Sequence, residues 1–350
     1  MRRIKKGSAI LLAAALVFSA LALPKAYAAV GIVEPEGGCS VEFSAPTSTF
    51  SELSTLEIPV HLYKVANIGV GGDCTPVTGI DTSLAVIDSN TTADEMKTLA
   101  AALKTEVETD GISVTKDAVL KNGAGNVSGL GIGLYLILPE TVNSAYNKYE
   151  FSPVVISLPS NNYYDNGNDT WIYDVEVDLK AEKSDRYGDL KINKTVDEYN
   201  ATVGGATFVF QVEATKTDVD TDETKTVYSN VVSLTFNGPG TESVLIQDLP
   251  AGAVVTVTEI YSGAGYKLSS ARTQTVTIVA KEENEVEQLS ETTVQGSPVE
   301  VSFLNTYDEG MNGGSGVVNS FSYAEGEWTW QQKAESTVEN AKPVVLEPQQ

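Results

Sequence analysis

The sequence predicts an all-β protein with immunoglobulin-like β-sandwich domains in tandem and one short helix in the first domain. Apolar residues recur at every second position in runs rich in Val, Thr, Ile, Tyr and Phe, which is the pattern of half-buried strands. Turn-forming pairs separate these runs, among them Asn122-Gly123, Asn166-Gly167 and Asn237-Gly238. Helical spacing is confined to 92–106, where Met96, Leu99 and Leu103 follow Thr92, a candidate N-cap.

Residues 1–28 have the composition of a secretory signal peptide. Four basic residues among the first six precede an apolar run over 8–23, and Ala26-Tyr27-Ala28 fits an A-x-A cleavage site. This run of 16 residues is short for a membrane-spanning helix, although an N-terminal anchor is the alternative. We therefore expect a secreted protein of the extracellular cell surface, with no membrane insertion after cleavage.

Two composition changes divide the rest of the chain. The charged stretch 181–188 predicts a boundary between a first domain over 30–182 and a second domain over 187–309. A Gly-rich linker begins at 309, so residues 310–350 form a flexible linker and a tail. We expect one or two strand-forming segments in this tail, not a further domain.

Charge and residue counts exclude several classes of function. Without the signal peptide the chain has 18 basic against 47 acidic residues, a net charge of −29 that argues against nucleic acid and anionic lipid as partners. A single histidine, His61, excludes His-rich zinc sites. Asp218, Asp220 and Asp222 have the spacing of a calcium loop but lack its Gly and Glu, which favours an acidic turn. We predict no metal, no cofactor and no enzyme activity.

The two cysteines are a candidate disulfide. Cys39 and Cys74 lie in Gly-rich, loop-like contexts, and an exported chain favours their oxidation. The alternative is two separate buried thiols.

Three strands of the second domain each place one polar residue on an apolar face, because alternate residues of a strand share a face. The polar residues are Lys194 in the first strand, Glu259 in a middle strand and Asn305 in the last. Their apolar neighbours on the same faces are Leu190, Ile192 and Val196; Ala253, Val255 and Val257; and Val299, Val301, Phe303 and Tyr307.

Buried separately, a Lys, a Glu and an Asn would each cost several kcal/mol. Together they can react. Burial lowers the pKa of a lysine and releases a neutral amine, and it raises the pKa of a glutamic acid, which can then donate to the carboxamide oxygen. Attack by Lys194 on Asn305, with Glu259 as proton shuttle, would release ammonia and form an isopeptide bond. The alternative is that Lys194 extends to solvent, Glu259 pairs at the surface and Asn305 caps a turn.

The second domain resembles the isopeptide-forming domains of Gram-positive pilins, of the Cna B type or streptococcal pilin isopeptide-linkage type. The matching motifs are Gly-Asp-Leu-Lys-Ile-Asn-Lys-Thr-Val (188–196), Gly-Ala-Thr-Phe-Val-Phe (205–210), Leu-Pro-Ala-Gly-Ala-Val-Val-Thr-Val-Thr-Glu (249–259) and Phe-Leu-Asn-Thr-Tyr (303–307). The resemblance places the linking lysine, the catalytic acid and the linking asparagine at Lys194, Glu259 and Asn305.

The first domain is similar to the N-terminal domain of backbone pilins assembled by sortases. The matching segments are 60–66, 133–138, 151–159 and 171–180. The resemblance implies that Lys180 receives the next subunit, although its Asp-Leu-Lys-Ala setting lacks the Pro and Asn of the family motif; an ordinary surface lysine is the alternative. The C-terminal residues contain no LPxTG-like signal, which leaves joining by a sortase open.

These observations predict a pilin or fimbrial shaft-like subunit of a Gram-positive bacterium. Its partners would be other pilin subunits, in a homopolymer, and a sortase remains a candidate. An adhesin of the same architecture, which binds a host protein or glycan through the first domain or the Trp-containing tail, is the alternative. A secreted enzyme with an accessory β-domain is a third interpretation.

Overall fold

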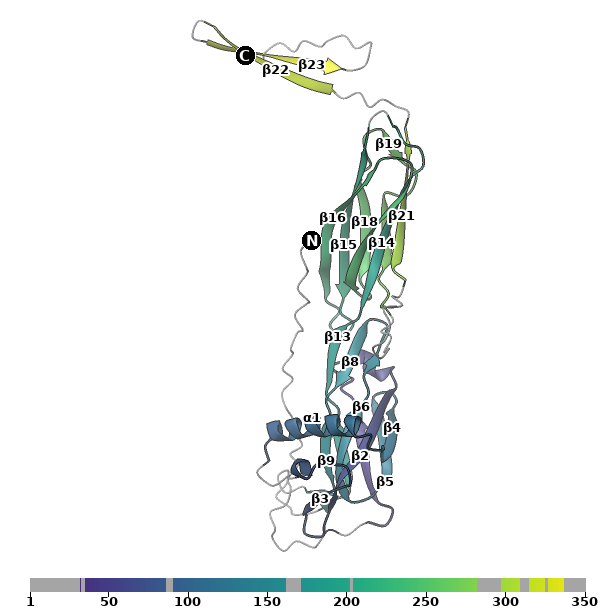
Figure 1. The fold of residues 1–350 in the computed structure, drawn as a ribbon, viewed down its shortest axis with the longest axis vertical. Helices are drawn as coiled ribbons and strands as arrows, with labels where there is room; N and C mark the ends of the chain where they lie inside the picture. Colours follow the sequence, from purple (N-terminus) through teal and green to yellow (C-terminus); the bar gives the residue numbers. More distant parts are fainter. Residues whose placement is uncertain are drawn as a thin grey trace.

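The computed structural model describes residues 32, 35–85, 91–161, 171–201, 204–281 and 297–308, and the backbone of 315–324 and 327–336. Two β-sandwiches lie end to end along the long axis of the molecule (Figure 1). Within the described ranges α1 is the single α-helix, so the all-β class is confirmed. The predicted signal peptide, 1–28, lies outside the described residues. No helix in the described part of the chain is long and apolar enough to cross a membrane.

The first sandwich packs a three-stranded sheet, ordered β12-β1-β5, against a larger sheet, ordered β3-β2-β6-β9 with β4 paired to β2. The smaller sheet contains β1 (Cys39–Ser44), β5 (Ala124–Leu130) and β12 (Asp174–Asp178). The larger sheet contains β2 (Ile58–Ile68), β3 (Cys74–Pro76), β4 (Lys116–Leu120), β6 (Gly133–Pro139) and β9 (Val154–Leu158). The alternate side chains that face inward from both sheets form one core cluster, which includes Phe43, Leu62 and Tyr135.

The predicted helix is α1 (Ala93–Thr109), which covers the outer face of the larger sheet. Thr92 is its N-cap and forms a capping box with Glu95, which satisfies backbone N–H groups of the first turn. Its buried face, with Leu103 at the centre, packs against Leu134 and Leu136 of β6. Two short 3₁₀ helices, η1 (Ser51–Ser54) and η2 (Thr82–Ala85), complete the helical elements described.

The predicted boundary stretch 181–188 consists of strand on both sides of Arg186. β13 (Ala181–Asp185) pairs with β8 (Asn147–Phe151), which also pairs with β7 (Val142–Asn143). A single residue, Arg186, separates β13 from β14, the first strand of the second sandwich. The remaining short strands of the first half are β10 (Ser160–Asn161) and β11 (Trp171–Ile172).

The second sandwich contains two four-stranded sheets, ordered β17-β14-β21-β19 and β16-β15-β18-β20. The first sheet comprises β14 (Tyr187–Val196), β17 (Gly240–Pro250), β19 (Tyr266–Leu268) and β21 (Val299–Tyr307). The second comprises β15 (Ala206–Thr217), β16 (Thr224–Phe236), β18 (Val254–Tyr261) and β20 (Thr273–Thr277). β14 and β21, the first and last strands, are parallel neighbours, with Val196 opposite Asn305. After this sandwich, β22 (Ser315–Ala324) and β23 (Glu327–Ser336) form an antiparallel hairpin, in agreement with strand-forming segments in the tail.

The predicted disulfide between Cys39 and Cys74 is not formed. Cys39 begins β1 and is buried in the core between the two sheets, whereas Cys74 lies in β3 and packs against the cluster beneath α1. The larger sheet therefore separates the environments of the two side chains.

A buried Lys–Glu–Asn site in the second sandwich

Lys194, Glu259 and Asn305 come from three different strands and meet in the core of the second sandwich. β14 and β21 lie side by side in one sheet and contribute Lys194 and Asn305, whereas Glu259 reaches them from β18 of the facing sheet. Each side chain occupies the inward position that the alternation of its strand predicts, and each is 0% exposed. The alternative with Lys194 at the surface and Glu259 in a surface pair is therefore wrong.

The three groups form a closed set of polar contacts. The Lys194 amine donates to Asn305 Oδ1 and lies 3.2 Å from Glu259 Oε2. The Asn305 Nδ2 group donates to the other carboxylate oxygen, Glu259 Oε1, at 2.7 Å. One oxygen of Glu259 thus faces the amine and the other faces the amide nitrogen. From the sequence we expected Glu259 to donate to the carboxamide oxygen, but this oxygen accepts from the Lys194 amine instead.

Apolar and aromatic side chains surround this set. The Phe208 ring centroid lies 4.5 Å from Lys194 Nζ, and Phe210 contacts Phe303 with ring centroids 5.0 Å apart. Burial in these surroundings lowers the pKa of Lys194 from 10.5 to about 8, although the Glu259 carboxylate acts in the opposite direction. At pH 7 about a tenth of such amines are neutral, far more than for an exposed lysine.

Two contacts of the site were not identified from the sequence. The backbone carbonyl of Ser262 accepts a second hydrogen bond from Asn305 Nδ2 at 3.2 Å and so fixes the carboxamide plane. The sequence could not indicate this contact, because every residue has a backbone carbonyl whatever its side chain. The Phe208 ring could have been found, because Phe208, Phe210 and Val212 alternate on the inward face of β15.

The other candidate residues lie away from this site. Lys180 is exposed between β12 and β13, as its place opposite the buried Val177 and Leu179 implies. Its backbone carbonyl accepts from Ser152 N at 3.0 Å, so the position is ordered.

The single histidine and the aspartate triplet have ionic partners of their own. His61 Nδ1 and Nε2 lie 2.7 Å from Asp117 and from Glu140. Asp218 and Asp220 contact the Lys183 ammonium, which occupies the space between their carboxylates. Among the described residues no group of three or more His, Cys, Asp or Glu side chains could hold a metal ion.

Comparisons with known proteins identify one family match and several structural neighbours. Residues 190–308 match a family described as a domain of unknown function (DUF5979). A comparison with curated proteins finds no match.

Among solved structures, several pilins are similar to this chain at low identity and low TM-score. The Streptococcal ancillary pilin is 11% identical, over 88% of this chain and 94% of that protein, with a TM-score of 0.27. The full-length major pilin SpaD of Corynebacterium diphtheriae is 12% identical, over 80% of this chain and 100% of that protein, with a TM-score of 0.26. The major pilin SpaA of the same bacterium is 11% identical, over 76% of this chain and 100% of that protein, with a TM-score of 0.23; its structure is described as pointing to a modular pilus assembly stabilizing isopeptide bonds.

Proposed function

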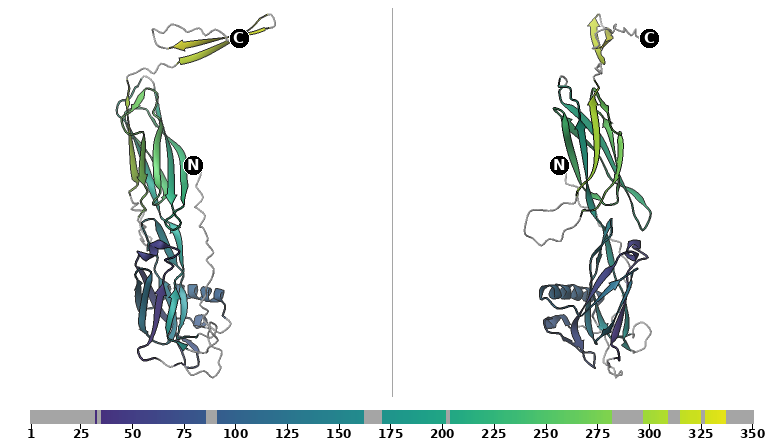
Figure 2. Two further views of the ribbon diagram at one scale, coloured as in Figure 1. Left: turned by 180° about the vertical axis from the view of Figure 1, so that it is seen from behind. Right: turned by 90° about the vertical axis from the view of Figure 1, so that its right-hand side faces the viewer.

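We propose that the chain is a secreted structural protein of the cell surface, a pilin or fimbrial shaft-like subunit. Its second sandwich is locked by an isopeptide bond that Lys194 and Asn305 form without any other enzyme. The observation that carries the proposal is the complete burial of Lys194, Glu259 and Asn305 in mutual contact. The end-to-end sandwiches (Figure 2) support a shaft-like role, as does the sequence resemblance of both halves to pilin domains.

The two oxygens of Glu259 divide the proton transfers of the reaction. The Lys194 ammonium passes a proton to Glu259 Oε2, 3.2 Å away, and the neutral amine attacks Cγ of Asn305. The Nζ–Cγ bond forms as the carbonyl π bond opens. Glu259, now a carboxylic acid, gives its proton to Asn305 Nδ2, which lies 2.7 Å from Oε1, and the carboxylate takes the second proton from the attacking nitrogen. The carbonyl π bond re-forms as the Cγ–Nδ2 bond breaks, ammonia leaves, and Glu259 ends the reaction protonated.

A second lysine of the same molecule illustrates why burial decides the chemistry. Lys183 also contacts two acidic side chains, but it is 18% exposed. Burial alone would lower the pKa of Lys183, yet hydrogen bonds to Asp220 and Asp218 raise it above 10.5. This ammonium stays charged and forms an ordinary ion pair. At Lys194, in contrast, the loss of solvent outweighs the effect of the carboxylate, and the pKa falls.

Intact-mass spectrometry of the chain without its signal peptide tests the proposed bond. We expect a mass about 17 Da below that of the sequence, since one NH₃ is lost per bond. Glu259→Ala removes the shuttle and should restore the unreacted mass. The control is Glu242→Gln, because Glu242 is the exposed residue opposite Lys194 on β17; this variant should keep the deficit. A parent chain at its full sequence mass would refute the bond.

A further inference from the structure

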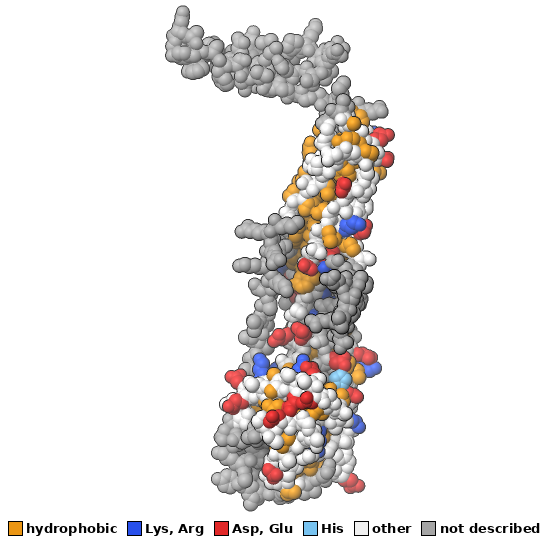
Figure 3. Space-filling view, viewed as in Figure 1, with side chains coloured by type: hydrophobic (Ala, Val, Ile, Leu, Met, Phe, Trp, Pro, Cys, Tyr) orange, Lys and Arg blue, Asp and Glu red, His pale blue; other side chains and the backbone are white. Residues whose placement is uncertain are grey.

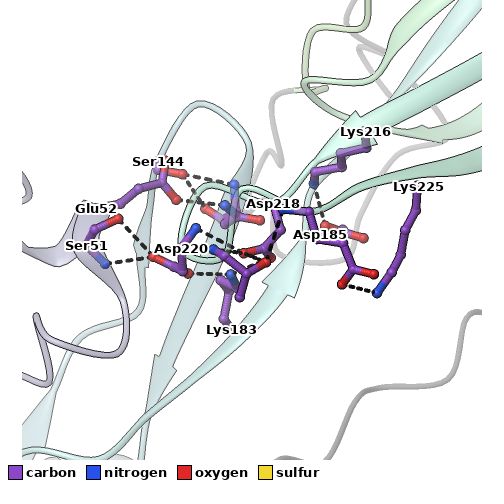
Figure 4. Close-up of polar contacts among 12 residues, drawn as sticks. Ser51, Glu52, Ser144, Lys183, Asp185, Lys216, Asp218, Asp220 and Lys225 are labelled. Carbon is purple, nitrogen blue, oxygen red and sulfur yellow. Dashed lines mark hydrogen bonds and ion pairs between the residues drawn. The ribbon is translucent and has the colours of Figure 1, made fainter.

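The charged tip of the β15–β16 hairpin extends from the second sandwich to the first. Asp218 and Asp220 lie at this tip, and Ser51 of η1 belongs to the first sandwich. The N–H and hydroxyl groups of Ser51 both donate to Asp220 Oδ1 at 2.8 Å. Lys183 of β13, the strand that connects the sandwiches, donates to Asp218 at 2.9 Å and also to Asp220. Figure 4 shows these four side chains converging.

Hydrogen bonds within the tip hold its turn. Asp218 Oδ1 accepts from the backbone N–H groups of Asp220 and Thr221 at 2.9 and 3.0 Å, which closes the turn and leaves Oδ2 for Lys183. Burial alone would raise the pKa of Asp218, but the hydrogen bonds from Lys183 and the turn amides lower it to about 2. Both acidic groups are therefore ionised throughout the physiological range.

The charged atoms of the contact are largely removed from water. The side chain of Asp220 is 11% exposed and that of Lys183 18%. A second ion pair, Lys216 to Asp185, links β15 to β13 beside them. Partly buried ion pairs with several hydrogen bonds hold their geometry far better than exposed pairs, which contribute little.

On the first-sandwich side, Glu52 is itself fixed. Its carboxylate Oε2 accepts from Asn147 Nδ2 and from the Tyr149 hydroxyl, both at 2.7 Å. Because Ser51 precedes Glu52 in η1, the two groups that Asp220 binds are presented by a rigid turn. The hairpin tip therefore binds η1, whose position is fixed by the hydrogen bonds of Glu52.

A second anchor involves Arg186, the residue between β13 and β14. Its guanidinium donates to Ser144 O at 2.6 Å and to Lys281 O at 3.3 Å, one carbonyl from each sandwich. Beside it, the Tyr146 ring packs so closely against Gly252 that a Cβ there would lie 2.9 Å from ring atoms. The contacts of Arg186 and those of the hairpin tip are separate, and both join the first sandwich to the second.

We propose that the β15–β16 tip is an ionic clasp that holds the two sandwiches in one fixed orientation. With Arg186 alone, the sandwiches could still pivot about the β13–β14 connection. With the tip engaged, two separate contacts span the joint, and the pivot is blocked. The clasp does not require the Lys194–Asn305 bond, so the two proposals stand or fall separately.

Distance distributions between paired nitroxide labels test the clasp. Labels at Glu176→Cys and Ser243→Cys place one probe on an exposed position of each sandwich. A Cys74→Ser background removes the half-buried thiol, and Cys39 is wholly buried. We expect one narrow distribution for the parent and at least a twofold wider one for Asp220→Ala and for Lys183→Met.

The matched control lies on the same hairpin. Lys225 pairs with Glu223 at 2.8 Å, but both side chains are about 60% exposed, at 62% and 60%. Lys225→Ala should leave the distribution narrow. In Asp220→Ala, hydrogen exchange of the Ser51 amide should also become at least tenfold faster. If Asp220→Ala and Lys183→Met fold, by circular dichroism, and keep the parental width, the clasp is refuted; Asp220→Asn provides the same test should Asp220→Ala fail to fold.

Discussion

The amine of Lys194 donates a hydrogen bond to the carboxamide oxygen of Asn305, although 111 residues separate the two in the chain. They lie on parallel neighbouring strands, β14 and β21, which begin and end the second sandwich. A covalent bond here would join the entry and the exit of the sandwich directly. Load along the chain would then bypass the hydrogen bonds between its strands.

Loss of this bond should weaken the second sandwich strongly. Asn305→Ala leaves an unlinked chain, and closing a loop of this length stabilises by about 4–5 kcal/mol in the chain-entropy picture. We expect a lower free energy of unfolding by at least this amount, measured by urea denaturation, together with faster tryptic cleavage. The control is Asn193→Ala. Asn193 precedes Lys194 on β14, and its substitution removes only a surface contact with Glu300. Equal stability of Asn305→Ala and the parent would contradict the prediction.

The unlinked variant should also depend on pH in an unusual direction. The folded-state pKa of Lys194 is lowered by burial to about 8, against 10.5 in the unfolded chain. Between these values the unfolded state binds more protons, so stability rises with pH. The destabilisation that results from burying the Lys194 ammonium is complete below pH 8 and absent above pH 10.5.

Relative to the parent, Asn305→Ala should therefore gain about 2 kcal/mol between pH 7.5 and pH 10. The parent provides the reference, because the proposed bond would make Lys194 an amide nitrogen, which does not titrate. Urea midpoints of both proteins, measured at several pH values, provide the comparison. Parallel curves for the two would show that Lys194 of the variant titrates normally or that Lys194 of the parent is unlinked as well.

Gly188 should tolerate no side chain. A Cβ at this position would lie 1.9 Å from the carbonyl oxygen of Val279, a backbone atom that cannot move aside cheaply. We expect Gly188→Ala to destabilise the second sandwich by at least about 2 kcal/mol in thermal or urea unfolding. Gly238→Ala is the control, since nothing lies within 4 Å of a Cβ there. Similar losses in both variants would contradict this explanation.

Lys180 is the proposed attachment point for a neighbouring subunit. Its exposure makes it accessible to a transferred acyl group. Incubation with a sortase and a peptide that carries an LPxTG sequence should attach the peptide at Lys180, detected by tryptic mapping. Lys180→Arg should abolish this product and Lys225→Arg should not. Labelling spread over many lysines would contradict a dedicated site.

The site was more accessible to prediction from sequence than the arrangement of the sandwiches. Side chains in a strand alternate strictly, so Lys194, Glu259 and Asn305 could be placed on inward faces without knowing the partners of their strands. The helix was predicted for a similar reason, because its spacing and its cap at Thr92 are local signals.

Features that depend on distant contacts were not predictable. Cys39 and Cys74 have loop-like neighbours in the sequence, but the sheet pairings bury them in different clusters. The charged stretch around Lys183 predicted a domain boundary but not the partners of this lysine. Lys183 contacts Asp218 and Asp220, whose position is set by the length of a hairpin and not by any local motif.

The strand order determines when the proposed Lys194–Asn305 bond can form. β21 lies between β14 and β19 and is the last strand of the second sandwich to be synthesised. Until that strand is added, Lys194 has the carboxylate of Glu259 beside it but no carboxamide to attack, and its sheet lacks a central strand. The proposed bond therefore cannot form until the whole second sandwich has been synthesised, and the chain would stay linear up to that point.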